Sequence, residues 1–343
     1  MNKNQSKITT NELSSETKAS MKTRIITSIV LALICLPCAF VGGWFYFALI
    51  FIVVAISTHE IVSVERKRRF SLFIYIFCFV IMFALVYWVF IKNQVLQYRD
   101  NPADYTFAIE KGFTTMSVST IAIAAAAGVF FFVVLANEKF TIHDTGYLFT
   151  MIVVVALGMQ ALLFMRYYPY SKFAFDSANN AIDITTPKFK YLHSAFLLIY
   201  LAIGVMINDI GAYFIGLLFG RKKVNPRISP KKTWEGFFGG IIISFVISFA
   251  FAITVSHFGM PILPFLTIDN WYWILLLSLA MPIIGNLGDF TFSSIKRHYE
   301  IKDFGTFLKG HGGVLDRLDS ALFAAIVVAS LIIFINNGWD FFL

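Results

Sequence analysis

The sequence predicts an all-α integral membrane protein that crosses the bilayer about nine times. Only 14% of its 343 residues are charged, whereas a water-soluble domain carries about 25%. Hydrophobic residues make up 58% of the chain, and apolar runs of about 20 residues recur along almost its whole length. A soluble bundle of nine buried helices would need a polar outer surface, which this composition does not supply.

Each predicted span is an apolar run bounded by polar or charged residues. The spans lie near residues 25–41, 44–63, 70–91, 115–136, 146–165, 191–219, 236–256, 271–295 and 314–335. The polar residues before the first span lack the apolar core of a cleavable signal peptide, so we expect a disordered cytoplasmic tail there. The chain then divides into this tail, two groups of transmembrane helices and a C-terminal transmembrane domain, at residues 1–22, 23–114, 115–190 and 191–343.

The distribution of basic residues predicts the orientation of the chain. With a cytoplasmic N-terminus and nine spans, 20 of the 28 Lys and Arg residues fall in the cytoplasmic segments 1–24, 65–69, 137–145, 220–235 and 296–312. Seven fall in exterior segments, and Arg317 lies in the last span. Because cytoplasmic loops are enriched in Lys and Arg, we expect the N-terminus inside and the C-terminus outside. The two basic loops of the C-terminal half then face the cytoplasm together.

The segment from Ser293 to Ser320, SSIKRHYEIKDFGTFLKGHGGVLDRLDS, concentrates polar chemistry beside a predicted membrane helix. Charge is costly there and is retained for function. The titratable residues concerned are Lys296, Arg297, Lys302, Asp303, Lys309, His311, Asp316, Arg317 and Asp319. Glycines in GHGG let the backbone approach a phosphate, and Asp316 and Asp319 share one helix face. Carboxylates beside Lys and Arg suit a divalent metal together with a phosphate.

A second polar constellation lies in residues 208–236, NDIGAYFIGLLFGRKKVNPRISPKKTWEG. Asp209 falls at membrane depth, where an acid is a functional candidate by default. Gly211, Gly216 and Gly220 are small positions that allow close helix packing. The loop that follows offers hydroxyl and ammonium donors suited to phosphate oxygens, without a P-loop motif. These donors are Ser229, Lys231, Lys232 and Thr233.

A third candidate is Asp289, which follows Gly288 in an apolar helix. Pro282 and Gly285 precede it and can kink or open that helix. A carboxylate at this depth needs a partner, and a metal ion or a lysine would serve.

The first 190 residues carry no comparable motif. His59 and Glu60 end the second span and are interpreted as a structural pair at the cytoplasmic interface. The basic run from Arg66 to Arg69 is interpreted as setting topology and touching anionic lipid headgroups.

These motifs resemble the signature of the phosphatidate cytidylyltransferase (CDP-diacylglycerol synthase) family over roughly residues 190–330. The C-terminal segment matches at Ser293, Lys296, Arg297, Lys302, Asp303, Gly305, Leu308, His311, Gly312, Gly313, Asp316, Arg317 and Asp319. The upstream block matches at Asp209, Ala212, Tyr213, Gly216, Gly220, Ser229, Pro230, Lys231, Lys232, Thr233, Glu235 and Gly236. Gly288-Asp289 is similar to the family's GDLxxS element. The departures are Ile210 for Thr, Phe290 for Leu, Phe292 for a common acid, and Lys309 for Pro, Gly or Ser.

The resemblance implies that CTP and phosphatidic acid react to give CDP-diacylglycerol and pyrophosphate, with residues 191–343 as the catalytic domain. It implies catalytic roles for Asp289, Lys296, Arg297, His311, Asp316, Arg317 and Asp319. Of these, Asp289, Asp316 and Asp319 would hold Mg²⁺, and a second cation could join it. Substrate binding would fall to Asp209, Ser229, Lys231, Lys232, Thr233, Ser293, Lys302, Asp303, Gly312 and Gly313.

The resemblance also implies a multi-pass protein of the cell membrane, surrounded by membrane lipids, with its active site on the cytoplasmic side. We expect a homodimer and no nucleic-acid partner.

Two other classes of function stay open. A different CTP-using lipid enzyme, such as a polyprenol kinase, would release CDP instead of pyrophosphate. A transporter also contains broken helices and buried acids, but here both basic motifs fall on one predicted side and no inverted repeat is visible. A CDP-alcohol phosphotransferase is disfavoured because its DGxxAR…GxxxDxxxD pattern is absent.

Overall fold

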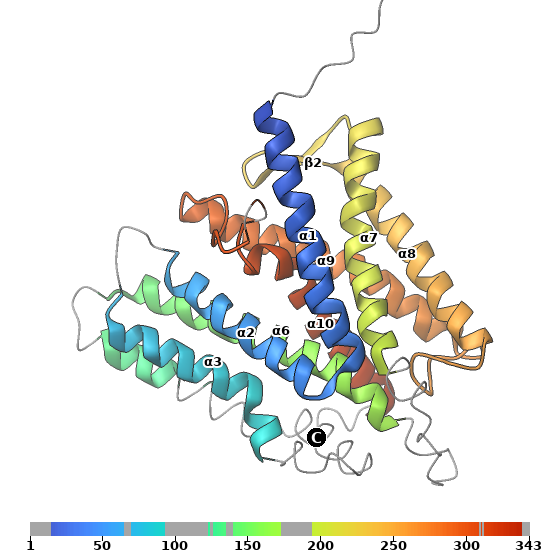
Figure 1. The fold of residues 1–343 in the computed structure, drawn as a ribbon, viewed down its shortest axis with the longest axis horizontal. Helices are drawn as coiled ribbons and strands as arrows, with labels where there is room; N and C mark the ends of the chain where they lie inside the picture. Colours follow the sequence, from blue (N-terminus) through green and yellow to red (C-terminus); the bar gives the residue numbers. More distant parts are fainter. Residues whose placement is uncertain are drawn as a thin grey trace, which may run out of the picture.

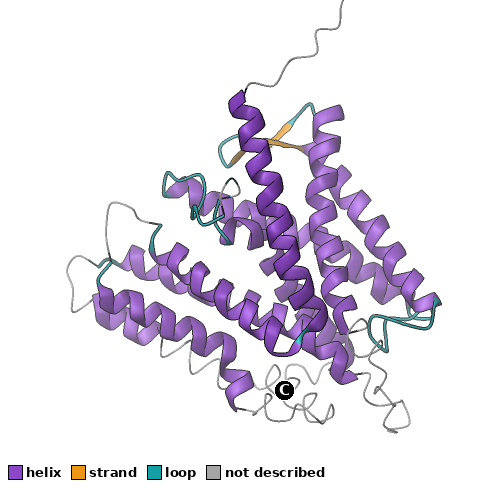
Figure 2. Cartoon of the chain, viewed as in Figure 1, coloured by secondary structure: helices purple, strands orange, loops and turns teal. Residues whose placement is uncertain are grey.

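The computed structural model describes residues 15–64, 70–92, 123, 126–134, 140–172, 194–308, 310 and 312–337 (Figures 1 and 2). These residues are mostly helical. The helices are α1 (Ser15–Val41), α2 (Gly43–Val62), α3 (Leu72–Lys92), α6 (Ile142–Lys172), α7 (Ser194–Phe219), α8 (Trp234–His257), α9 (Trp271–His298) and α10 (Leu315–Asn337). A short antiparallel hairpin, β1 (Lys223–Asn225) and β2 (Ser229–Thr233), joins α7 to α8.

Six of the described helices are long and apolar enough to cross a membrane: α2, α6, α7, α8, α9 and α10. Shorter apolar segments lie in α1, at Ile29–Val41, and in α3, at Leu72–Tyr87. The chain is therefore an all-α, multi-pass membrane protein, as the sequence predicts. The predicted span 115–136 is described only at residue 123 and residues 126–134, so the count of nine spans stays a prediction.

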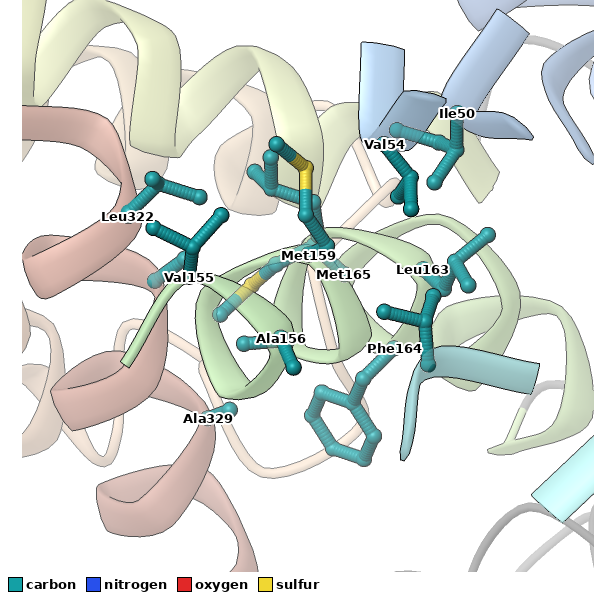
Figure 3. Packing of buried hydrophobic residues seen from close by; sticks show 14 of the residues in the cluster. Ile50, Val54, Val155, Ala156, Met159, Leu163, Phe164, Met165, Leu322 and Ala329 are labelled. Carbon is teal, nitrogen blue, oxygen red and sulfur yellow. The ribbon is translucent and has the colours of Figure 1, made fainter. Parts of the chain in front are cut away.

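Helix α6 holds the two halves of the chain together. It packs against α2 and α3 on one side and against α7 and α10 on the other (Figure 1). In Figure 3, Val155 and Met159 of α6 lie between Leu322 of α10 and Val54 of α2. The N-terminal helices thus share one continuous apolar core with the motif-bearing helices.

The tight turn between α1 and α2 is fixed by a buried cation. Gly42 has a φ of 67°, a conformation that glycine adopts at little cost. Arg166 Nε donates to the Ala39 carbonyl at 2.6 Å, and its Nη2 donates to the Phe40 carbonyl at 3.0 Å. A cation therefore satisfies carbonyls at the C-terminal end of α1. Arg166 lies one residue beyond the predicted span 146–165, but it falls within α6 and is buried.

Helices α7 and α8 approach each other through glycine. A Cβ added at Gly240 would lie 2.6 Å from the Asn208 carbonyl oxygen, and one added at Gly236 would lie 2.6 Å from that of Ala212. No larger residue fits at these two positions without moving the backbones apart. Thr233 ends the hairpin and caps α8, because its side-chain oxygen accepts from the Gly236 N–H at 3.2 Å.

Helices α9 and α10 also meet closely, at the level of the predicted acids. A Cβ added at Gly288 would lie 2.7 Å from the Asp319 carbonyl oxygen. Pro282 is buried inside α9, and the helix continues past it to His298. The residue after Gly288 is Asp289, so the close contact brings two of the predicted functional positions into one layer.

Candidate active site between α9, α10 and the β1–β2 hairpin

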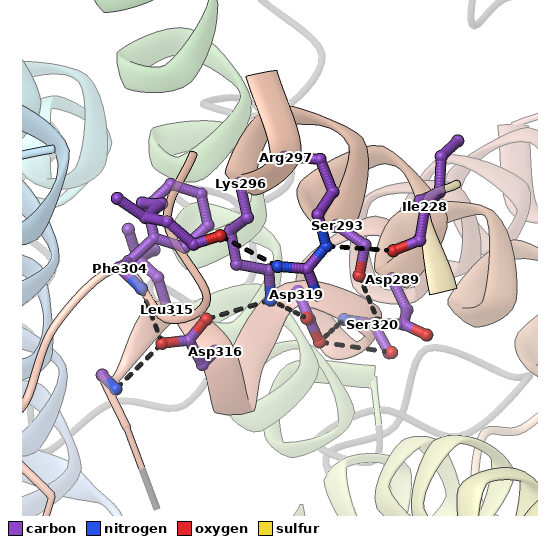
Figure 4. A network of polar contacts seen from close by, with 12 residues as sticks. Ile228, Asp289, Ser293, Lys296, Arg297, Phe304, Leu315, Asp316, Asp319 and Ser320 are labelled. Atoms are coloured by element: carbon purple, nitrogen blue, oxygen red, sulfur yellow. Dashed lines mark hydrogen bonds and ion pairs between the residues drawn. The ribbon is translucent and has the colours of Figure 1, made fainter. Parts of the chain in front are cut away.

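Asp316, in the first turn of α10, is held by three donors from the chain. Its Oδ1 accepts from Lys296 Nζ at 3.0 Å, and its Oδ2 accepts from the backbone N–H groups of Phe304 and Gly313 at 2.9 Å each (Figure 4). The side chains of Lys296 and Asp316 are only 9% and 4% exposed. A buried charge pair needs such further hydrogen bonds to compensate for lost hydration. Asp316 therefore fixes the signature loop onto the start of α10.

Lys296 also reaches the next acid of the signature. Its Nζ lies 3.7 Å from Asp319 Oδ2, one turn along α10 from Asp316. Asp319 is buried, and its Oδ1 accepts from the Ser320 N–H at 2.7 Å. One ammonium group thus stands between two carboxylates, in agreement with the predicted shared helix face.

The second motif reaches this site through Lys232. Its Nζ pairs with Asp289 Oδ2, which joins β2 to α9. Asp289 Oδ1 accepts a hydrogen bond from Ser293 Oγ at 3.4 Å. The lysine partner that the sequence analysis offered for a carboxylate at this depth is therefore present. The contact brings together two residues that are 57 positions apart in the chain.

Asp209 completes the acidic cluster from α7. It interacts electrostatically with Asp289 and Lys232, and Asp319 interacts with both Asp289 and Asp209. We define the acidic cluster as Asp209, Asp289 and Asp319. Beside it, Asn208 and Asn286 exchange side-chain hydrogen bonds of 3.1 and 3.2 Å, and both are buried. This amide pair ties α7 to α9 next to Asp209.

The donor chemistry of the acidic cluster fits Mg²⁺. Among the described residues no three ligating side chains are gathered as a ready metal cage. Mg²⁺ seldom uses such a cage, since it binds through one or two carboxylates together with substrate phosphates and water. Asp289 and Asp319 offer that pair of carboxylates. Asp316, the third predicted ligand, has a side chain that is 4% exposed, against 21% for Asp289, and its oxygens accept from two backbone N–H groups as well as from a lysine.

Other predicted site residues have local structural partners. Arg297 donates through Nε to the Ile228 carbonyl at 3.3 Å and through Nη1 to the Ile301 carbonyl at 2.9 Å. It therefore clamps the hairpin turn to the end of α9. Gly312, with a φ of 86°, packs against Asp303, since an added Cβ would lie 3.2 Å from the Asp303 Cγ.

The remaining predicted site residues are described by their positions in the fold. Arg317 lies in α10 and interacts electrostatically with Asp209. Ser229 and Lys231 lie on β2 and Lys302 follows α9, and no contact in the described part of the chain joins their side chains to the acids. His311 and Lys309 fall outside the described residues.

Known proteins are similar to this chain over most of its length. The sequence model of the cytidylyltransferase family matches residues 22–335, which is most of the chain. The chain belongs to this family. It is 28% identical over 303 residues to the phosphatidate cytidylyltransferase of Bacillus subtilis, covering 88% of this chain and 94% of the relative. The phosphatidate cytidylyltransferase of Staphylococcus epidermidis is 28% identical over 314 residues, covering 91% and 99% of the two chains.

The family match extends over the N-terminal helices. One of them, α2, supplies a carboxylate that accepts hydrogen bonds at the start of α10. Glu60, near the end of α2, accepts from the backbone N–H groups of Val314 and Leu315 at 2.8 and 2.9 Å. It is 2% exposed and therefore buried within the protein, whereas His59, its partner in the predicted interfacial pair, is exposed. The sequence feature that could have indicated this role is a single acid near the end of an apolar helix. Glu60 shares this feature with Asp209.

Proposed function

We propose that this cytidylyltransferase transfers the cytidylyl group of CTP to phosphatidic acid, giving CDP-diacylglycerol and pyrophosphate. The observation that carries the proposal is the contact between Lys232 and Asp289, because it joins the hairpin motif to the signature in one site. The names of the relatives support the choice of substrates. The reaction would supply an activated lipid for phospholipid biosynthesis.

The proposed chemistry is an attack by the lipid phosphate on the α-phosphorus of CTP. Both groups are anionic, so cations must neutralise them before they can approach. Lys232 and Lys296 stand on either side of the acidic cluster and are held there by Asp289 and Asp316. Arg317 lies within electrostatic range of Asp209 and adds a third positive group. Positioning and charge then supply most of the catalysis, and no protein nucleophile is needed.

We assign the Mg²⁺ ligands to Asp289 and Asp319. When bound, Mg²⁺ would neutralise the nucleotide phosphates at these carboxylates. Asp316 would instead orient Lys296, because its side chain is more buried than that of Asp289 or Asp319 and its oxygens accept from two backbone N–H groups as well as from that ammonium. Asp209 would contribute charge to the cluster or bind a second cation. His311, Lys302, Ser229, Lys231 and Thr233 stay proposed phosphate-binding residues.

We place this site on the cytoplasmic side of the cell membrane, where CTP is present. The contact between Lys232 and Asp289 supports one shared side for the loops 220–235 and 296–312. The excess of Lys and Arg in these loops supports the cytoplasmic side. Nine spans, an interior N-terminus, an exterior C-terminus and a homodimer stay part of the proposal.

The test is to incubate purified protein with phosphatidic acid, Mg²⁺ and each of the four nucleoside triphosphates, and to identify both products. We expect CTP alone to be consumed, with CDP-diacylglycerol and pyrophosphate formed in equal amounts. Release of CDP with a phosphorylated lipid would indicate a kinase instead. The Asp319→Asn variant serves as the control for contaminating activity.

A further inference from the structure

Two glycines of the signature, Gly305 and Gly313, lie against the buried carboxylate of Glu60. A Cβ added at Gly305 would collide with Glu60 Oε1, and it would lie 2.8 and 2.9 Å from Cδ and Cγ of the same side chain. A Cβ added at Gly313 would lie 2.6 Å from Oε1 and 2.7 Å from Oε2. These distances are shorter than van der Waals contact, which is about 3.5 Å. Glu60 therefore occupies the space into which any larger residue would place its side chain.

The space taken by Glu60, and not the backbone, accounts for glycine at residue 305. Gly310 and Gly312 of the same loop have φ values of 79° and 86°, which favour glycine. Gly305 and Gly313 are not among the described residues with a positive φ. At Gly305 the three atoms nearest to an added Cβ all belong to Glu60, so alanine would fit there if that side chain were absent. At Gly313 the Gly305 nitrogen is also close, at 2.7 Å.

The loop between these glycines is held at both ends by carboxylates. The backbone N–H groups that follow Gly313 donate to Glu60, at 2.8 and 2.9 Å. The N–H groups of Phe304 and Gly313 donate to Asp316 Oδ2, at 2.9 Å each. Glu60 from α2 and Asp316 from α10 thus bind the same two stretches of backbone. A displacement of one carboxylate would shift the donors of the other.

We propose that Gly305 and Gly313 form a socket for the Glu60 carboxylate, and that the filled socket positions Asp316 and its partner Lys296 for the reaction. The second half of this proposal rests on the proposed function, because it takes the roles of Asp316 and Lys296 from there. Glu60 acts through Asp316 and is therefore a positioning residue. Glycines in GHGG suit a close approach of the backbone to a phosphate, but the group that approaches Gly313 here is a carboxylate of the protein itself.

Gly305→Ala tests the socket, because its added Cβ would meet the Glu60 side chain before any other group. Glu60 and Gly305 both line a cavity of about 860 Å³ between α2, α3 and residues 304–307. A carboxylate that is expelled from the socket has this space to enter, so we expect the variant to fold. Gly305→Ala should then reproduce the defect of Glu60→Ala, and the double variant should be no worse than either single variant.

The matched control is Gly288→Ala. Its added Cβ would lie 2.7 Å from the Asp319 carbonyl oxygen, a clash of similar size in which Glu60 takes no part. The losses caused by Gly288→Ala and Glu60→Ala should therefore multiply in turnover and add in Tm, as for independent sites.

The measurements are Tm and steady-state kinetics in detergent, with the kinetics taken at a temperature where every variant is folded. A purely structural defect leaves kcat unchanged at that temperature, whereas a positioning defect lowers it. We expect kcat to fall about tenfold in Gly305→Ala and in Glu60→Ala, as for the loss of one charged hydrogen bond. The KM for CTP should change little, because the displaced groups act on the chemical step. Adding Gly305→Ala to Glu60→Ala should lower neither kcat nor Tm further.

Multiplied losses in this double variant, or normal Tm and kcat in Gly305→Ala, would overturn the socket. A shared effect on Tm without a fall in kcat would overturn the positioning role. If Gly305→Ala alone fails to fold, recovery of folded protein on adding Glu60→Ala supports the socket, and continued failure overturns it. The Tm measurements need no turnover, so they test the socket even if the unsubstituted chain makes no CDP-diacylglycerol, a result that would count against the proposed function alone.

Discussion

Glu60 and Leu315 are joined by a hydrogen bond of 2.9 Å between a buried carboxylate and the first backbone N–H of α10. The same carboxylate accepts from Val314 at 2.8 Å. The first N–H groups of a helix have no partner within it and carry partial positive charge, so a buried acid there is stabilising. Asp316 follows Leu315 directly. The N-terminal helix α2 therefore fixes the position from which the signature acids project.

The first prediction follows from this contact. Glu60→Gln keeps the size of the side chain but removes its charge, and it offers one acceptor where the carboxylate offers two. We expect the free energy of unfolding to fall by about 1.5–3 kcal/mol, with a lower Tm and roughly tenfold slower turnover. Glu235→Gln is the matched control, because Glu235 also accepts backbone N–H groups, from Arg221 and Lys222, but is exposed. Equal effects of the two variants would refute a special role for Glu60.

The second prediction concerns the contact between α9 and α10. Gly288→Ala would place a Cβ 2.7 Å from the Asp319 carbonyl and force the helices apart. Overpacking of this kind costs about 1–3 kcal/mol, and turnover should fall because Asp289 and Asp319 separate. Gly285→Ala is the control on the same helix, since its nearest atoms would be 3.7 Å away. Thermal unfolding and turnover in detergent measure both effects, and equal behaviour of the two variants would contradict the prediction.

The sequence predicted the class of fold because apolar run length alone marks membrane helices. Charge at membrane depth also marked Asp209 and Asp289 as candidates, and the family resemblance implied that Lys232 and Asp319 belong to the same site. It did not predict Glu60 as the cap of α10, because that contact joins residues 255 positions apart. Spacing along the chain likewise could not show that Arg297 turns away from Lys296 to hold a backbone carbonyl. Such assignments depend on helix packing.

The third prediction separates two kinds of aspartate. Asp289→Asn and Asp319→Asn should each lower turnover about 100-fold or more and raise the Mg²⁺ concentration needed for half-maximal rate. Asp316→Asn should lower turnover as well, because Lys296 loses its charged partner, but should leave the Mg²⁺ dependence unchanged. Titrations of rate against Mg²⁺ distinguish the two. Near-normal activity of a variant at saturating Mg²⁺ would remove that residue from the proposed metal site.

The fourth prediction concerns topology. Cysteines placed in residues 220–235 and 300–310 should react with an impermeant reagent from the cytoplasmic side. Cysteines in residues 95–110 and 170–185 should react from the exterior, as the uneven distribution of Lys and Arg predicts. Intact cells and inverted vesicles provide the two accessible faces. If the first two loops reported opposite sides, the shared site could not exist.

The last prediction concerns the chemical step. The described site contains acids, bases and glycines, and two of its hydroxyls are already engaged in other contacts. Thr233 caps α8, and Ser293 donates to Asp289, which is itself paired with Lys232. Asp289, which accepts from the Ser293 hydroxyl, is paired with Lys232 and assigned to Mg²⁺, so it is a poor base for the proton transfer that a covalent mechanism would need. We therefore expect direct displacement at the α-phosphorus of CTP by the lipid phosphate.

Direct displacement requires both substrates to be bound at once and inverts the configuration at that phosphorus. Steady-state kinetics should accordingly give intersecting double-reciprocal lines, and chiral α-thio-CTP should give inverted product. The control is the Asp319→Asn variant, which should form no product on the same timescale. Retention of configuration, or nucleotide trapped on the protein in the absence of lipid, would show that a side chain attacks first. The acidic cluster and its lysines would then serve a two-step reaction, and one of the hydroxyls would have to leave its present partner to begin it.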